Sequence, residues 1–202
     1  MDIKIQEIKA DLLDRYSKIP IRFEVSSMLQ ITLIEGGLGG IALTEKEVEK
    51  PYVKDYDSYE TVCSLAIASN AIERWSKLFD ISKWGFFLAL DGEREVGGIT
   101  LAFNTPGVYM LNGQTDISVL WDFRVHPEFR RQGIGAKLFE HAIMWSRDRG
   151  CRQLKIETQN INVPACKFYA KQGCKLGMID IYGYAGVPEV CHETMLVWYF
   201  DL

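Results

Sequence analysis

The chain has 202 residues, of which 48% are hydrophobic, and its formal net charge at pH 7 is −4. This length and apolar content suffice for a buried core, so we predict a single domain over residues 1–202. The acidic balance, with no run of Lys or Arg, excludes a nucleic-acid footprint, and no stretch approaches the roughly 18 apolar residues of a membrane span. The negative charge weakly favours a cationic small molecule as a partner.

The cysteine pattern indicates free thiols rather than disulfides or a metal site. The chain has five cysteines, an odd number with no Cys-x-x-Cys spacing, which is typical of a reducing compartment. Residues 1–7 have mixed charge and do not resemble a secretory signal. We therefore expect a cytoplasmic protein with no bound metal, in which Cys166 and Cys174 are packing residues.

The sequence of the first quarter of the chain predicts short strands or helices joined by turns. Residues 3–16 fit a strand, an amphipathic helix, or a strand that runs into a helix. Residues 21–33 predict a strand or a pair of strands. Residues 36–40 contain four glycines and predict a turn rather than a second phosphate loop, because no helix pattern follows them. Residues 50–57 are polar and aromatic, and we expect them to form a loop.

The rest of the chain alternates strand and helix patterns. Residues 58–79 repeat apolar side chains at helical spacing, and Asp91-Gly92 separates two apolar runs as in a β-hairpin. Asn112-Gly113 marks a turn. The further predicted elements are strands at 84–90, 95–103, 118–125, 154–158, 175–183 and 193–200, and helices at 136–149 and 163–172.

The most informative segment is Arg130–Gly135, which lies between the strand at 118–125 and the helix at 136–149. A glycine-bearing turn that opens a helix leaves main-chain N–H groups unpaired at the positive end of the helix dipole, which is a phosphate-binding arrangement. Arg130 and Arg131 would add mobile positive charge. The third glycine of the dinucleotide fingerprint and the Gly-Lys-Ser/Thr of the nucleoside-triphosphate loop are both missing, which excludes those two ligands.

Two motifs resemble the GNAT (Gcn5-related N-acetyltransferase) superfamily. Arg130-x-x-Gly133-x-Gly135 fits its Arg/Gln-x-x-Gly-x-Gly/Ala signature, and residues 162–174 fit its Asn-x-x-Ala-x-x-Phe-Tyr-x-Lys-x-Gly-Phe block, with Cys174 in place of Phe. The resemblance covers about residues 84–200. It implies an α/β fold with a mixed, mostly antiparallel central sheet and a splayed cofactor cleft flanked by helices. Residues 84–200 would be the acetyl-CoA-binding core, and residues 1–83 a variable part on the acceptor side.

By this resemblance, acetyl-CoA is the co-substrate. Its pyrophosphate would lie on the main-chain N–H groups of the turn, and its pantetheine arm would pair with the strand that ends at residues 123–125, in a gap beside residues 154–159. Asn162 could reach the pantetheine amides or cap its helix. The predicted cofactor-binding residues are Phe123, Val125, Arg130, Arg131, Gln132, Gly133, Ile134, Gly135, Ala136 and Asn162.

The resemblance also suggests the catalytic groups. Tyr169 matches the tyrosine that often acts as general acid, and a phenol with an ordinary pKa near 10 is protonated at neutral pH, as a proton donor must be. It could instead be a core aromatic. Asp122 and Glu157 are the acidic candidates for the general base, and a structural hydrogen bond explains either of them equally well. His126 and His192 are alternatives.

Three segments are similar to streptothricin acetyltransferases of Gram-positive bacteria, namely residues 50–56, 157–162 and 165–171. Those enzymes acetylate an amino group on the β-lysine arm of a cationic antibiotic. Where that group has Glu-Asp, this chain has Trp121-Asp122. Five side chains between residues 52 and 60 fit either an acceptor pocket or a solvated loop: Tyr52, Asp55, Tyr56, Asp57 and Glu60.

These observations predict an N-acetyltransferase acting on a primary amine of a small, cationic, streptothricin-like molecule, with antibiotic resistance as the biological role. Two alternatives are a GNAT enzyme that acetylates protein or peptide amines and a non-catalytic acyl-CoA-binding module. The expected partner is a small-molecule amine, with no nucleic acid and no membrane. A homodimer is compatible with the sequence.

Overall fold

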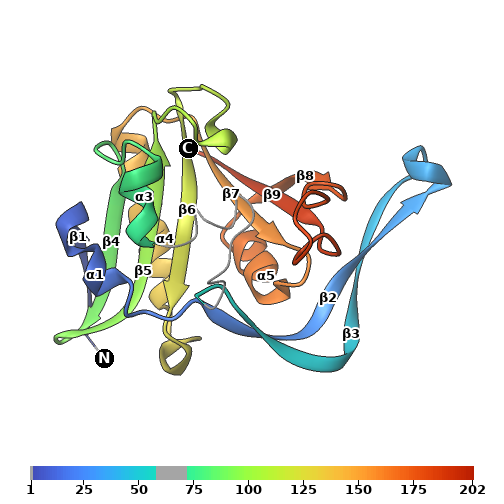
Figure 1. Ribbon diagram of the computed structural model, residues 1–202, viewed down its shortest axis with the longest axis horizontal. Helices are drawn as coiled ribbons and strands as arrows, with labels where there is room; N and C mark the ends of the chain where they lie inside the picture. The colour runs from blue at the N-terminus through green and yellow to red at the C-terminus, as the bar shows by residue number, and fades with distance from the viewer. Residues whose placement is uncertain (1, 58–71) are drawn as a thin grey trace. The chain divides into compact units, whose positions relative to one another are not determined.

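The computed structural model describes residues 2–57 and 72–202 (Figure 1). Seven strands form one sheet in the order β1-β4-β5-β6-β7-β9-β8, and β2 and β3 form a two-stranded sheet. The strands are β1 (Ile3–Ile8), β2 (Arg22–Ile34), β3 (Gly40–Asp55), β4 (Gly85–Asp91), β5 (Arg94–Phe103), β6 (Ile117–Val125), β7 (Gln153–Gln159), β8 (Lys175–Asp180) and β9 (Met195–Asp201). The α-helices are α1 (Leu13–Tyr16), α3 (Ile72–Leu78), α4 (Ile134–Asp148) and α5 (Val163–Lys171). Short 3₁₀ turns lie at Ala10–Leu12 (η1), Glu35–Gly37 (η2), Tyr109–Leu111 (η3) and Pro127–Phe129 (η4).

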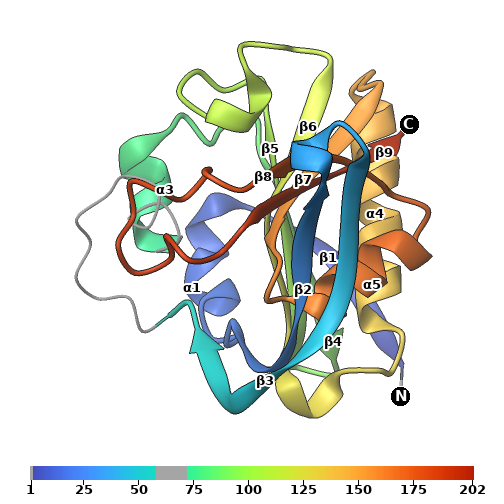
Figure 2. The same ribbon diagram turned by 90° about the vertical axis from the view of Figure 1, so that its right-hand side faces the viewer.

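The chain divides into two compact units. The first comprises Met1–Arg22, Asp55–Ile156 and Tyr199–Leu202. In it β1, β4, β5 and β6 pair antiparallel, with β4 and β5 joined as the predicted hairpin. Figure 2 shows α4 on one face of these strands and α1 and α3 on the other. The mixed, mostly antiparallel sheet with helices on its faces confirms the predicted α/β class.

Helix α4 forms because its apolar side chains recur on one face. Ile134, Leu138, Phe139 and Trp145 are all buried in that face, and each such side chain contributes roughly 1.5–3 kcal/mol on burial. The helix starts at Ile134, two residues before the predicted start. A Cβ at Gly97 of β5 would lie 3.0 Å from Leu138 Cδ1, so the missing side chain there lets α4 approach the sheet closely.

Strand β6 carries a bulge near its middle. Thr100 of β5 pairs with Asp122, whereas the next residue, Leu101, pairs with Leu120, so Trp121 is the extra residue. On the other side, β6 pairs in parallel with β7 over Ile117–Leu120 and Gln153–Ile156. Within the described residues this ladder ends at Leu120, while the pairing with β5 continues to Val125.

The second unit comprises Phe23–Lys54 and Glu157–Trp198. It contains the long ribbon of β2 and β3, the end of β7, then α5, β8 and most of β9. Asn160 holds these parts together: it exchanges hydrogen bonds of 2.9 and 3.0 Å with Leu29 of β2, and its Oδ1 accepts from Thr194 N at 2.8 Å.

The prediction of a loop over residues 50–57 is wrong, because β3 continues to Asp55. Most side chains of this strand are exposed on both faces of the ribbon, so the sequence lacks the apolar alternation that marks a half-buried strand. Pro51 is tolerated there because a two-stranded ribbon consists of edge strands.

Most other predicted elements are confirmed, with small shifts at their ends. Residues 3–16 form a strand followed by short helical turns, and β8 ends at Asp180, three residues before its predicted end. Of the predicted helix at 58–79, α3 covers residues 72–78, and residues 58–71 lie outside the described part of the chain. None of the described helices is long and apolar enough to span a membrane. The single-domain assignment stays a prediction.

Candidate active site

The turn between β6 and α4 exposes a cluster of main-chain donors. Among the described residues, no protein acceptor binds the N–H groups from Arg131 to Ala136, and no side chain caps the helix start. The first N–H that has a partner belongs to Lys137, which donates to Gly133 O at 3.2 Å. These donors lie at the positive end of a 15-residue helix, which is the arrangement that binds a phosphate group.

The backbone of this turn explains its glycine. Gly133 has φ of +81°, in the left-handed region, and a Cβ there would meet nothing within 4 Å. Glycine is therefore required for conformation and not for space. Arg131 also has a positive φ, +61°. Left-handed residues alternating with ordinary ones turn successive N–H groups toward one point, a concavity known to bind anions.

The two arginines of the turn differ, which corrects the expectation that both are mobile. Arg130 Nε donates to Val125 O at 3.0 Å, and the same guanidinium donates to the carbonyl of Arg22. Burial, and then the positive charge of Arg22, lower the pKa of Arg130. Arg130 therefore ties the turn to the end of β6. The Arg131 side chain is exposed, like that of Arg130. Gln132 Nε2 donates to Glu128 O at 3.2 Å.

Asp122, one of the two predicted bases, lies in a buried ion-pair network. Its Oδ1 accepts from Arg124 Nε at 2.8 Å and from the Tyr16 hydroxyl at 2.7 Å, and its Oδ2 accepts from Arg124 Nη2 at 2.9 Å. Burial alone would lower the pKa of Arg124, but the paired carboxylate raises it well above its usual range. Burial and the negative charge of Asp122 together raise the pKa of Tyr16. These contacts favour the structural alternative for Asp122.

Arg124 is the centre of this network, and the sequence-based prediction missed it. Its side chain is 1% exposed, and its Nη1 donates to Ile19 O and to Asp57 Oδ1, both at 3.0 Å. One signal was available, because Asp122 and Arg124 are two apart on a strand and therefore point to the same face. The segments around residues 19 and 57 come from distant parts of the sequence, so no local pattern brings them to this arginine.

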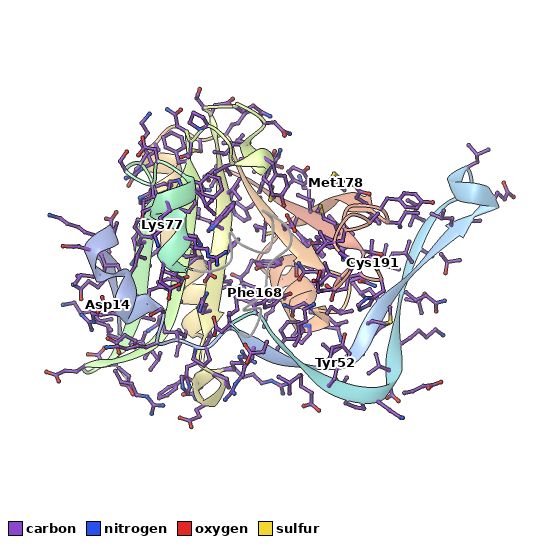
Figure 3. The ribbon with its side chains drawn as sticks, in the orientation of Figure 1. Asp14, Tyr52, Lys77, Phe168, Met178 and Cys191 are labelled. Atoms are coloured by element: carbon purple, nitrogen blue, oxygen red, sulfur yellow. The ribbon has the colours of Figure 1, made fainter. Side chains whose placement is uncertain are left out.

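Asn162 and Tyr169 lie two turns apart on α5, in the second unit. Asn162 caps the helix, its Oδ1 accepting from Ala165 N at 3.2 Å, so the capping role is observed and its contact with the cofactor stays a prediction. Tyr169 is 5% exposed, and its ring lies 5.5 Å from that of Phe168, labelled in Figure 3, and 6.5 Å from that of Trp198.

Glu157, the other predicted base, has a different environment from Asp122. The Tyr184 hydroxyl donates to its Oε1 at 2.7 Å. Burial raises the pKa of this carboxyl above its usual value, and the hydrogen bond from Tyr184 opposes that rise. A neutral phenol neutralises no charge, whereas the guanidinium beside Asp122 does. Of the two acids, Glu157 is therefore the one whose pKa its surroundings raise.

The remaining candidates have structural surroundings. Burial raises the pKa of the Cys166 and Cys174 thiols to about 12, so both remain protonated and inert, as expected of packing residues. His126 Nδ1 accepts from Glu128 N at 3.4 Å and caps a turn. The four described cysteines are free thiols, and Cys63 lies outside the described residues.

The predicted site residues thus form two groups. The turn residues, with Asp122, Phe123 and Val125, belong to the first compact unit, and Glu157, Asn162 and Tyr169 belong to the second. Both groups fall within the segment that matches a known family: residues 51–174 match the acetyltransferase (GNAT) family.

Similar proteins agree with this match. A streptothricin acetyltransferase of Escherichia coli is 38% identical over 85 residues, 42% of this chain and about half (49%) of that protein's length. Streptothricin acetyltransferase A of Bacillus subtilis is 27% identical over 157 residues, 78% of each protein. A Bacillus anthracis protein crystallised with acetyl coenzyme A has a TM-score of 0.72 and 25% identity, with 100% of this chain and 98% of that one covered.

The chain therefore belongs to the acetyltransferase (GNAT) family. Within it, the chain is similar in sequence to the streptothricin acetyltransferases of Escherichia coli and Bacillus subtilis, and it spans about half the length of the first of these. The family match confirms the resemblance drawn from the two motifs, and the fold class with it.

Proposed function

We propose that this chain acetylates a primary amine of a small cationic molecule of the streptothricin class. The observation that carries the donor half of this proposal is the row of N–H groups from Arg131 to Ala136, which no protein acceptor in the described residues occupies. The acceptor half rests on the names of the relatives and on the net charge of −4, which favours a cation.

The turn suits the diphosphate of coenzyme A by chemistry as well as by position. Its donors are main-chain amides at a helix start, and the exposed Arg131 adds a charge that can form bidentate bonds to phosphate. When bound, acetyl-CoA supplies the acetyl group as a thioester. The residues proposed to hold it are Phe123, Val125, Arg130, Arg131, Gln132, Gly133, Ile134, Gly135, Ala136 and Asn162.

Two side chains move protons in the proposed reaction. The amine nitrogen forms a bond to the acetyl carbon, and the carbon–sulfur bond breaks. Glu157 accepts the proton that the amine loses, because burial raises the pKa of its carboxyl and so makes it a stronger proton acceptor. Tyr169 donates a proton to the departing sulfur. Asp122 takes no part in proton transfer, because Arg124 and Tyr16 engage both of its oxygens.

A direct assay tests the proposal. Purified protein is incubated with acetyl-CoA and a panel of amines comprising streptothricin, free lysine and short peptides, and the released thiol is followed. We expect turnover with streptothricin and much less with the others. If only peptides are acetylated, the proposed acceptor is wrong, and the substrate is a peptide amine. Tight coenzyme A binding without turnover on any amine would favour the non-catalytic module and overturn the proposal.

A further inference from the structure

Three side chains at the end of β7 form a chain of hydrogen bonds. The Tyr184 hydroxyl donates to Glu157 Oε1 at 2.7 Å, and Gln159 Nε2 donates to the same hydroxyl oxygen at 3.0 Å. Glu157 and Gln159 are two apart on a strand, so their side chains point to the same face. Tyr184 lies in the connection between β8 and β9, and its hydroxyl bridges the side chains of Glu157 and Gln159.

This arrangement directs the single proton of the phenol. Gln159 is a donor to Tyr184, so it occupies a lone pair of the hydroxyl oxygen and leaves the hydroxyl proton for Glu157. Glu157 Oε1 must then be the acceptor, and an ionised carboxylate accepts such a bond more strongly than a neutral carboxyl group does. Tyr184 itself is 9% exposed, so water competes little for this bond.

The backbone around Tyr184 is held in place by its own turns. Asp180 Oδ1 accepts from Tyr182 N at 2.9 Å, and Tyr184 O accepts from Val187 N at 2.9 Å. The connection therefore presents the phenol at a defined position. A group whose only task was to fill space would need neither the short bond to a carboxylate nor the supporting amide.

We propose that Tyr184 is a positioning residue for acetyl transfer, whose hydroxyl holds the Glu157 carboxylate in one orientation and in its ionised form. This inference rests on the proposed role of Glu157 as proton acceptor. Burial of Glu157 disfavours its charged state, and Tyr184 is the ionisable side chain that contacts this carboxyl within the described residues. The phenol offsets part of the cost of burial.

The test is the pH dependence of kcat/KM in Tyr184→Phe. A general base must be deprotonated, so activity falls as pH drops through its pKa. Because the hydrogen bond from Tyr184 lowers the pKa of Glu157, its loss raises that pKa, and the acidic limb moves upward by about one pH unit. At pH values below this limb, kcat/KM of Tyr184→Phe is then about tenfold lower than that of the parent, while the plateau at high pH changes little.

Tyr182→Phe is the matched control, because Tyr182 lies two residues away and is 76% exposed. Its pH profile should equal that of the parent.

A second readout does not depend on turnover. With ¹³C-labelled glutamate, the carboxyl resonance that disappears in Glu157→Gln identifies Glu157, and its titration should shift upward in Tyr184→Phe. An unshifted resonance and an unshifted limb would overturn the role of Tyr184 while leaving acetyl transfer intact. If Glu157→Gln keeps the activity and the limb of the parent, Glu157 is not the base, and the inference falls with that assignment and not with the acetyltransferase activity.

Discussion

At the scale of single residues, Tyr169 is the group whose removal most directly tests the chemistry. We predict that Tyr169→Phe keeps the affinity for coenzyme A, because the phenyl ring still packs against Phe168 and Trp198. Turnover should fall about 10²–10⁴-fold, the usual contribution of a positioned proton donor. Steady-state kinetics and calorimetric titration with coenzyme A measure the two effects separately.

The matched control for Tyr169 is Tyr109→Phe, which removes a hydroxyl from a side chain that is 54% exposed and outside both groups of site residues. It should leave turnover unchanged. If Tyr169→Phe also turned over at the parent rate, Tyr169 would be a core aromatic, as its burial alone would suggest, and the leaving sulfur would take its proton from elsewhere.

The residue scale also shows why two acids that look alike in sequence have different roles. Asp122 and Glu157 both lie in strands that border the predicted cofactor gap, and sequence spacing alone does not distinguish their roles. The difference lies in partners that are distant in the chain: Asp122 meets a guanidinium and a phenol, whereas Glu157 meets a phenol alone among the described residues. An ion pair fixes a carboxylate as a structural charge, while a buried carboxyl without a cation has a raised pKa.

At the scale of elements, the turn before α4 makes a steric prediction. In Gly135→Trp an indole stands in the first turn of α4, where the diphosphate must approach the main-chain N–H groups. We expect the affinity for coenzyme A to fall at least tenfold, because the donors remain but the ligand cannot reach them. Isothermal titration measures this affinity.

Glu140→Trp is the control for Gly135→Trp, because it places the same side chain at an exposed position further along α4. Its affinity for coenzyme A should match that of the parent, and the circular dichroism of both variants should be unchanged. Unaltered affinity in Gly135→Trp would contradict the assignment of this turn as the phosphate site.

The elements that could be predicted from sequence are those whose signals are local. The hairpin of β4 and β5 follows from Asp91-Gly92 between apolar runs, and the phosphate turn follows from glycines between a strand and an amphipathic helix. The end of β3 was missed because a strand exposed on both faces has no apolar alternation. The Arg124 network was missed because Tyr16, Ile19 and Asp57 reach it only through the tertiary fold.

At the scale of the whole molecule, the candidate site residues are distributed over the two compact units, and each unit has its own stabilising hydrogen bonds. In the first unit, Arg124 joins β6 to the segments around residues 19 and 57 through its hydrogen bonds. In the second, Asn160 joins β2, the end of β7 and the segment before β9. Neither Arg124 nor Asn160 is a predicted catalytic residue. Each holds main chain that is close in sequence to a predicted catalytic residue.

The last prediction concerns this structural role of Arg124. In Arg124→Ala the buried Asp122 carboxylate loses its cation, and breaking a buried ion pair in this way costs about 3–5 kcal/mol of unfolding free energy. For a chain of this size we expect Tm to fall by roughly 6–20 °C. Arg124→Lys should recover only part of the loss in Tm, because an ammonium cannot form the bidentate bond to Asp122.

Arg131→Ala is the contrasting variant. The Arg131 side chain is exposed, so Tm should stay within about 2 °C of the parent while the affinity for coenzyme A falls. If Arg124→Ala melted at the parent temperature, the network around Asp122 would not stabilise the first unit, and Asp122 would again be a candidate for proton transfer.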